Sequence, residues 1–197
     1  MAPTEASLDR ISSESPTRLE PLARTCEPRV EATRTIGVTM RIQKEIIRLQ
    51  GIIDLPFGEL HARVEGFYAR HMQLLDSGRA EEWAAQFTED AVFDVPTLPE
   101  PVRGREGLIA SVREGRRRLA ESGQRHRHWQ GVIDVQRQDD GTLQVRAYTQ
   151  VLASTVGEGP EGGRSWLHRV CVCEDVLVVE GEAFLVRSRK VTRDDLA

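Results

Sequence analysis

The chain has 197 residues, a formal net charge of -4 and 39% hydrophobic residues, which suits one globular domain with an appendage. The acidic balance provides no global basic field for nucleic acid, and no stretch approaches the roughly 20 apolar residues of a membrane span. Three cysteines are too few for a disulfide framework, and residues 1–10 lack the basic and apolar regions of a secretory signal, so we expect a cytoplasmic protein.

Residues 1–56 are expected to form an N-terminal arm. Residues 1 to about 34 are rich in Pro, Ser, Thr, Glu and Arg and show no sustained apolar period, which favours a flexible segment. Apolar residues then recur at helical spacing, which predicts a helix over 36–53. A single domain is expected over 57–197.

The first part of that domain predicts helices and one strand. Residues 58–77 place apolar side chains at helical spacing, which predicts an amphipathic helix that stops at Gly78. The segment "AEEWAAQF" predicts a second short helix, and "TEDAVFDVP" predicts a strand that Pro96 ends. Another helix is predicted over 106–121.

The rest of the domain is expected to consist of long strands. They are predicted over 126–137, 142–155, 164–179 and 183–192, separated by "QDDG", "GEGPEGG" and "EGE". The sequence "DDG" between alternating runs is a hairpin signal. The order of elements therefore predicts an α+β fold, with helices gathered on one face of a curved, mostly antiparallel sheet.

Several of these segments resemble a known family. "FYARHMQLLDSGRAEEWAAQFTEDAVFDVP" followed by "VRGREGL" resembles the opening of the NTF2-like superfamily, in the branch of SnoaL-like polyketide cyclases and β subunits of aromatic-ring-hydroxylating dioxygenases. "RHW" and "EAFLVRSRKVTRDD" resemble the same branch, so the resemblance covers about 57–197. It implies a cone, in which a bent sheet wraps around a long helix and encloses an apolar cavity. Within the branch, the chain looks most like small accessory proteins of actinomycete aromatic polyketide pathways, which implies a role in polyketide and antibiotic biosynthesis.

The segment "RHRHWQG" contains the first candidates for chemistry. In a strand, His126, His128 and Gln130 share one face, while Arg127 and Trp129 share the other. A metal site would need a third ligand, and no spacing in the sequence demands one, so we expect no metal. The two histidines are either solvated or structurally satisfied, or one of them faces the cavity. The resemblance implies His128 in that position, acting as acid or base.

Tyr68 and Asp94 complete the predicted catalytic set. Tyr68 lies on the face of the first helix that should meet the sheet, where its hydroxyl either bonds to backbone or holds a substrate carbonyl or enolate oxygen. Asp94 points to solvent if Phe93 points into the core, and it becomes an acid–base group if it faces inward. The resemblance implies a cavity aspartate paired with the histidine for an aldol ring closure, and Asp76 lies close to the helix turn.

The long strands supply candidates for ligand binding. Trp166, His168 and Val170 share one face of the third long strand. Tyr148 and Leu152 share a face of the neighbouring strand. This mixed apolar and hydrogen-bonding lining fits a flat, oxygenated aromatic ligand, although core packing explains His168 equally well. The predicted substrate-binding residues are Met72, Gln130, Tyr148, Trp166 and His168.

Two functions of different classes follow from these residues and the resemblance. The first is a cofactor-free cyclase, dehydratase or isomerase, in which His128 removes a proton next to a carbonyl of an aromatic polyketide and Tyr68 or His168 stabilises the enolate. The second is a non-catalytic partner subunit, or a ligand-binding protein, of an oxygenase or polyketide tailoring complex. Because exposed sheet surface is a liability and NTF2-like proteins commonly pair their sheets, we also expect a homodimer.

Overall fold

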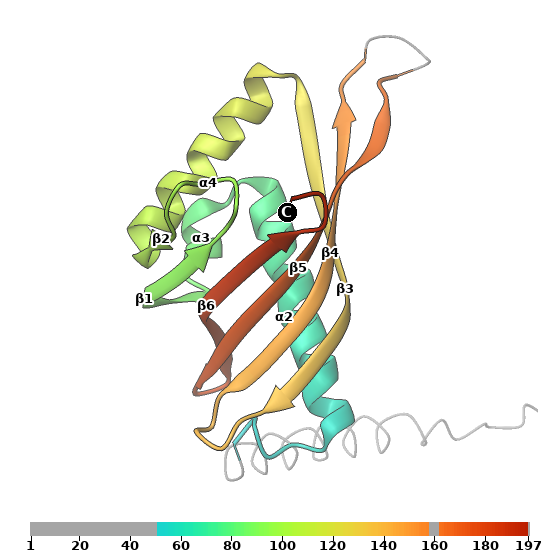
Figure 1. Cartoon of the computed structure of the whole chain (residues 1–197). Coiled ribbons are helices and arrows are strands. Elements are labelled where there is room, and N and C mark those ends of the chain that lie inside the picture. Colours follow the sequence, from blue (N-terminus) through green and yellow to red (C-terminus); the bar gives the residue numbers. More distant parts are fainter. Residues whose placement is uncertain (1–50, 158–161, 197) are drawn as a thin grey trace, which may run out of the picture. The chain divides into compact units, whose positions relative to one another are not determined.

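A computed structural model describes residues 51–157 and 162–196. In this part of the chain, helices pack against a curved, open, six-stranded sheet, which confirms the α+β prediction (Figure 1). Residues 36–50 of the predicted helix and most of the predicted arm lie outside the described residues, and residues 51–53, where that helix was expected to end, are not helical. No helix among the described residues is long and apolar enough to cross a membrane.

The helices follow the predicted positions to within a few residues. They are α2 (Phe57–Ser77), α3 (Ala80–Ala84) and α4 (Gly104–Glu121). Helix α2 ends as its sequence predicts, because Gly78 adopts a left-handed conformation with φ 71°. Its buried face is a stripe at helical spacing, made of Leu60, Val64, Tyr68, His71, Met72 and Leu74.

The strands form one sheet with the order β2-β1-β6-β5-β4-β3. Strands β3 to β6 are joined by antiparallel hairpins, and β1 pairs in parallel with β6. Figure 1 shows α2 running along one face of the long strands. The strand bounds are β1 (Phe87–Asp94), β2 (Val102–Arg103), β3 (Gln124–Arg137), β4 (Leu143–Thr155), β5 (Ser165–Glu180) and β6 (Ala183–Arg193).

Irregular positions bend the long strands and change which side chains face α2. In β3 the register shifts between Gly131 and Asp134, where Val132 has a positive φ of 49°. In β5 the register shifts near its start. Val151 on β4 pairs with Arg169, whereas the next residue of β4, Leu152, pairs with Leu167, so His168 is left without a partner on β4. Such bulges increase the local twist and reverse the alternation of side chains beyond them.

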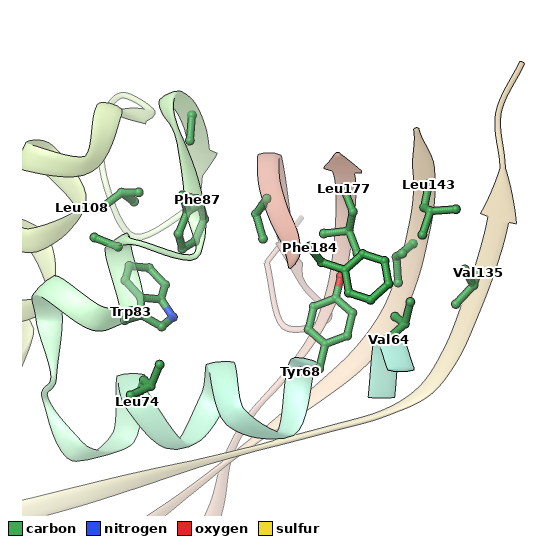
Figure 2. Packing of buried hydrophobic residues seen from close by; sticks show 14 of the residues in the cluster. Val64, Tyr68, Leu74, Trp83, Phe87, Leu108, Val135, Leu143, Leu177 and Phe184 are labelled. Carbon is green, nitrogen blue, oxygen red and sulfur yellow. The ribbon is translucent and has the colours of Figure 1, made fainter. Parts of the chain in front are cut away.

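The hydrophobic core fills the space between the helices and the sheet. Figure 2 shows Trp83, Phe87 and Leu108 gathered among α3, β1 and α4, while Tyr68 and Phe184 meet where α2 crosses the long strands. The rings of Trp83 and Phe87 pack edge to face, with their centroids 4.6 Å apart. Each fully buried side chain of this size contributes about 1.5–3 kcal/mol.

The core also includes two residues that precede α2. Ile52 and Leu55 are 1% and 3% exposed and belong to the same buried cluster as the helix stripe. Arg137 at the end of β3 donates a hydrogen bond of 2.7 Å from Nε to the carbonyl oxygen of Ile53. The segment just before α2 is therefore packed as part of the domain.

Candidate active site

A cavity of about 270 Å³ lies between α2, α4 and the inner face of the sheet. Its walls are mostly apolar, with a few polar groups from the long strands, which is the usual character of a small-molecule site. Helix α4 contributes the side opposite the strands. The lining includes Met72, Leu75, Asp76, Trp83, Phe93, Val95, Val112, Leu119, His126, His128, Thr149, Val151, Arg169, Cys171, Cys173, Arg189, Val191 and Arg193.

A histidine–aspartate pair is part of this wall. The distance from His128 Nδ1 to Asp76 Oδ1 is 2.6 Å, and the backbone N–H of His128 donates to Asp76 Oδ2 at 3.0 Å. The aspartate side chain is 9% exposed and the histidine side chain 24%. Because an ionised carboxylate only accepts hydrogen bonds, Nδ1 is the donor, and in the neutral imidazole Nε2 therefore carries the free electron pair. This arrangement orients a histidine to act as a base.

The end of α2 positions the aspartate. Asp76 lies four residues after Met72, so the stripe that faces the sheet also carries the carboxylate to the cavity. Gly78 then ends the helix, and an added Cβ there would lie 2.7 Å from the Arg116 side chain. Glycine at this position therefore allows both the left-handed turn and the close approach of α4.

A second histidine, His126, lies two residues before His128 on β3. His126 also lines the cavity, and its ring centroid lies 4.9 Å from that of His168. Burial, together with the nearby histidines and Arg169, lowers the pKa of His126 to about 4. This imidazole is therefore neutral near pH 7. Its Nε2 atom is buried and has no hydrogen-bond partner among the described residues.

Beneath the cavity, a buried ion pair joins β5, β6 and α2. Arg189 donates from Nε to Asp175 Oδ1 at 2.8 Å and from Nη2 to Oδ2 at 2.6 Å. The Tyr68 hydroxyl donates to Asp175 Oδ2 at 2.7 Å. The arginine and aspartate side chains are 3% and 1% exposed. Burial, together with the adjacent aspartate, raises the pKa of Tyr68, so the hydroxyl stays protonated.

The same network fixes the tautomer of a third histidine. Arg189 Nη1 lies 3.0 Å from His71 Nε2, and His71 Nδ1 lies 2.8 Å from Gln86 Oε1. An arginine only donates, so Nε2 accepts and the Nδ1 proton is donated to the glutamine. Burial lowers the pKa of His71, and the positive charge of Arg189 lowers it further. His71 is therefore a neutral support for the arginine.

Among the described residues, His128 and Met72 are the predicted site residues that line the main cavity. Tyr68 is 1% exposed and its hydroxyl is committed to Asp175, so it supports the cavity floor from below. Phe93 and Val95 line the cavity, so the intervening Asp94 points to the opposite face. The carboxylate beside His128 is that of Asp76.

The other predicted binding residues lie elsewhere. Tyr148 is 44% exposed on the outer face of the sheet, and Trp166 is 37% exposed at the start of β5. His168 touches His126 but lies outside the main cavity lining. Gln130 lies opposite Thr149, and neither amide atom has a partner among the described residues. The bulge near the start of β5 explains the difference for that strand, because it turns Arg169 and the alternate residues after it toward the cavity.

The residues that the sequence prediction missed are charged or thiol side chains on the inner face. Asp175 shares the alternation of Cys171 and Cys173, which was the available signal that it faces inward. Burial raises the pKa of both cysteine thiols, so they stay protonated. Within residues 51–157 and 162–196, no group of three or more His, Cys, Asp or Glu side chains is placed to hold a metal ion.

Three solved structures resemble the chain in sequence and fold. Aln2 from a Streptomyces species is 30% identical with a TM-score of 0.62, covering 72% of this chain and 95% of its own. ActVI-ORFA from Streptomyces coelicolor is 30% identical with a TM-score of 0.59, covering 72% and 99%. A Catenulispora acidiphila protein in complex with S-DNPA is 31% identical with a TM-score of 0.60, covering 70% and 96%. A search among curated proteins found no match.

More distant structures share the fold alone. The β subunit of a putative aromatic-ring-hydroxylating dioxygenase from Novosphingobium aromaticivorans is 19% identical with a TM-score of 0.53, covering 68% of this chain and 88% of its own. The family model for the SnoaL-like domain matches residues 59–190, which is most of the chain. The resemblance noted in the sequence is thereby confirmed, and the chain belongs to the SnoaL-like domain family.

Proposed function

We propose that the protein is an enzyme that cyclises, dehydrates or isomerises a small carbonyl compound by proton transfer at His128. Membership of the SnoaL-like family supports an isomerase- or cyclase-type role on a small molecule. The observation that carries the proposal is the hydrogen bond of 2.6 Å between His128 and Asp76 at the wall of a mostly apolar cavity. Side chains alone can carry acid–base chemistry of this kind, so the proposed reaction requires no cofactor.

In the proposed step, Nε2 of His128 takes a proton from the carbon next to a carbonyl. The C–H bond breaks, its electron pair forms a C=C bond to the carbonyl carbon, the carbonyl π pair moves to the oxygen to give an enolate, and Asp76 stabilises the imidazolium that forms. Arg189 lines the same cavity and has N–H groups beyond those bound to Asp175 and His71. Its fixed positive charge is suited to stabilise the enolate oxygen.

As substrate we propose an aromatic polyketide intermediate. The apolar walls fit a flat ring system, and the polar groups among them offer partners to ring oxygens. The Catenulispora acidiphila protein in complex with S-DNPA shows that a chain 31% identical to this one binds a small molecule. The resemblance to accessory proteins of polyketide pathways points to the same class.

The proton-transfer step is tested without knowledge of the natural substrate. The bicyclic ketone 2-tetralone exchanges the protons next to its carbonyl with D₂O, and proton NMR measures the rate. We expect the protein to accelerate this exchange, and the substitution His128→Gln to remove the acceleration, because general base catalysis contributes about 10²–10⁴-fold. His61→Gln is the matched control, since His61 lies on α2 outside the cavity and bonds to the carbonyl of Ile133.

Two results would contradict the proposal. One is an acceleration of exchange that survives His128→Gln, and the other is folded wild-type protein that exchanges the probe no faster than buffer alone. Circular dichroism of both variants establishes that they fold. Loss of activity in the control as well would show that the assay reports structural damage instead of the base.

We also propose that a second copy of the chain covers the outer face of the sheet. Trp129, Leu152, Leu167 and Tyr148 lie on that face and are 65%, 36%, 51% and 44% exposed. Neighbouring apolar side chains exposed in this way are characteristic of an interface. Face-to-face pairing of sheets is what the family resemblance implies, and it would leave the cavity on the inner face open to ligand.

Sedimentation analysis of the wild-type chain and of Trp129→Lys tests this pairing. A dimer that dissociates on substitution is the expected outcome, because a lysine on the paired face would be desolvated on association. A wild-type monomer would contradict the homodimer. It would leave the exposed face to a larger partner such as an oxygenase subunit, which is the alternative function.

A further inference from the structure

Arg169 is a cavity cation that forms no ion pair within the described residues. Arg189 is paired with Asp175 and Arg193 with Asp195, at 2.6 and 2.9 Å. By contrast, Arg169 makes no hydrogen bond or ion pair in the part of the chain that the structure describes, and its Nε atom is buried without a partner there. A buried charged donor without an acceptor is costly, so the site is arranged for a group that arrives from outside.

The sheet places this arginine in line with the proposed base. His128 on β3 pairs with Val151 on β4, and Val151 pairs with Arg169 on β5. Directly opposed residues share a face, so all three side chains lie on the cavity side. Two strand spacings separate the Cα atoms of the histidine and the arginine, a distance of about 10 Å. One ligand can therefore reach both residues.

The surroundings of Arg169 favour an oxyanion. Asp194 and Asp195 line a neighbouring pocket together with Arg169, but neither forms an ion pair with it, and Asp195 is paired with Arg193. In the main cavity, His126 lines the same part of the wall, is neutral, and has a buried Nε2 without a partner among the described residues. Cys171 is adjacent and protonated, and it pairs across the sheet with Arg193. The carboxylate of Asp76 is engaged by His128 through both oxygens. The anion is thus expected at the arginine.

We propose that Arg169 binds a carboxylate of the substrate, which makes the ligand an aromatic acid that extends from Arg169 to His128. The planar guanidinium offers parallel N–H groups that match the two oxygens of a carboxylate. His126 donates or accepts one further bond beside it. The position of the reacting carbon rests on the function proposed above, whereas the anion site does not.

The test compares two probes of the same shape that differ in charge, 1-naphthaleneacetic acid and 1-naphthaleneacetamide. Binding is measured by titration calorimetry with the whole chain. We expect the acid to bind at least about tenfold more tightly than the amide, since a charge-assisted hydrogen bond in a partly desolvated site has about this effect. Arg169→Gln is expected to reduce the ratio to about one, and Arg169→Lys to retain part of it.

Arg125→Gln is the matched control, because Arg125 is exposed on β3 and its loss changes the net charge equally. The control is expected to keep the full preference. Equal affinity of the wild-type protein for both probes, or a preference that survives Arg169→Gln, would overturn the proposal. If Arg169→Gln does not fold, the folded Arg169→Lys variant decides the question. A preference for the acid that falls further than in Arg125→Gln supports the anion site, and an unchanged preference refutes it.

The same titration in the His128→Gln variant separates this inference from the proposed function. Preference for the acid is expected to persist there, because the anion site does not need the base. If the wild-type chain does not accelerate tetralone exchange but still prefers the acid over the amide, the proton-transfer role alone is overturned. Retained exchange without preference would overturn the anion site alone.

Discussion

Substitution of Asp175 by asparagine should destabilise the protein severely. The carboxylate is 1% exposed and accepts from two nitrogen atoms of Arg189 and from the hydroxyl of Tyr68. Asparagine keeps the shape but removes the negative charge, and its amide group offers donors where the neighbours also donate. A buried arginine is then left without its counter-charge, which costs about 3–5 kcal/mol.

The same geometry predicts a smaller effect for Tyr68→Phe. That change removes one donor, while Oδ2 of Asp175 still accepts from Arg189 at 2.6 Å. The loss is about 1.5–3 kcal/mol, the usual range for a hydrogen bond to a charged group. Paired replacement by Asp175→Leu and Arg189→Met should recover much of the stability lost in either single variant, because apolar residues of similar volume tolerate burial.

Urea denaturation, followed by far-ultraviolet circular dichroism, measures the free energy of unfolding of each variant. In thermal melts, the loss for Asp175→Asn corresponds to a decrease in Tm of roughly 6–20 °C for a chain of this size. If Asp175→Asn costs less than Tyr68→Phe, or if the double variant is less stable than both single variants, the ion pair is not the main stabilising element beneath the cavity.

Three further outcomes are expected. Asp76→Asn should lower tetralone exchange by about 10²–10⁴-fold without loss of the folded circular dichroism spectrum, because the histidine loses its fixed tautomer. His71 has a lowered pKa in the folded chain, so its contribution to stability is present above about pH 6.5 and is lost as the pH falls below that value. The urea midpoint should therefore fall as the pH is lowered from 7.5 to 5, and it should fall less steeply in His71→Gln. Val132→Gly should raise Tm slightly, by about 1–4 °C, since Val132 is 76% exposed and has a positive φ of 49°. An unchanged or lowered Tm would show that the bulge holds valine without strain.

The elements of the fold were predictable because periodicity and turn residues are local signals. The spacing of Leu60, Val64 and Tyr68 predicts α2, and glycine-containing turns separate the long strands at nearly the observed positions. The irregular positions were not predictable in the same way. Nothing in the run from Trp166 to Cys173 marks the bulge that turns Arg169 toward the cavity, because a bulge is set by how neighbouring strands pair.

The composition of the cavity was only partly visible in the sequence. The spacing in "RHRHWQG" placed His126 and His128 on one face of a strand, and the resemblance selected His128; both histidines line the cavity. Arg189 and Asp175 were missed because charged residues are expected at the surface, and only pairing across two strands and a helix makes their burial possible. Asp76 was harder to choose over Asp94, since which carboxylate meets the histidine depends on where α2 ends relative to β3.

The polar groups of the cavity fall into two classes that have different physical meanings. Asp76 with His128, and Asp175 with Arg189, are satisfied inside the protein, so they are preorganised before any ligand arrives. Arg169 and His126 carry buried atoms without partners in the described residues, and we propose that a ligand supplies the missing hydrogen bonds. Groups that are already hydrogen-bonded within the protein suit the reacting centre, because reorganisation there slows the chemistry. Groups that lack a hydrogen-bond partner suit recognition, because the ligand supplies that partner. We therefore propose proton transfer at His128 and ligand choice at Arg169 as two roles that can fail separately.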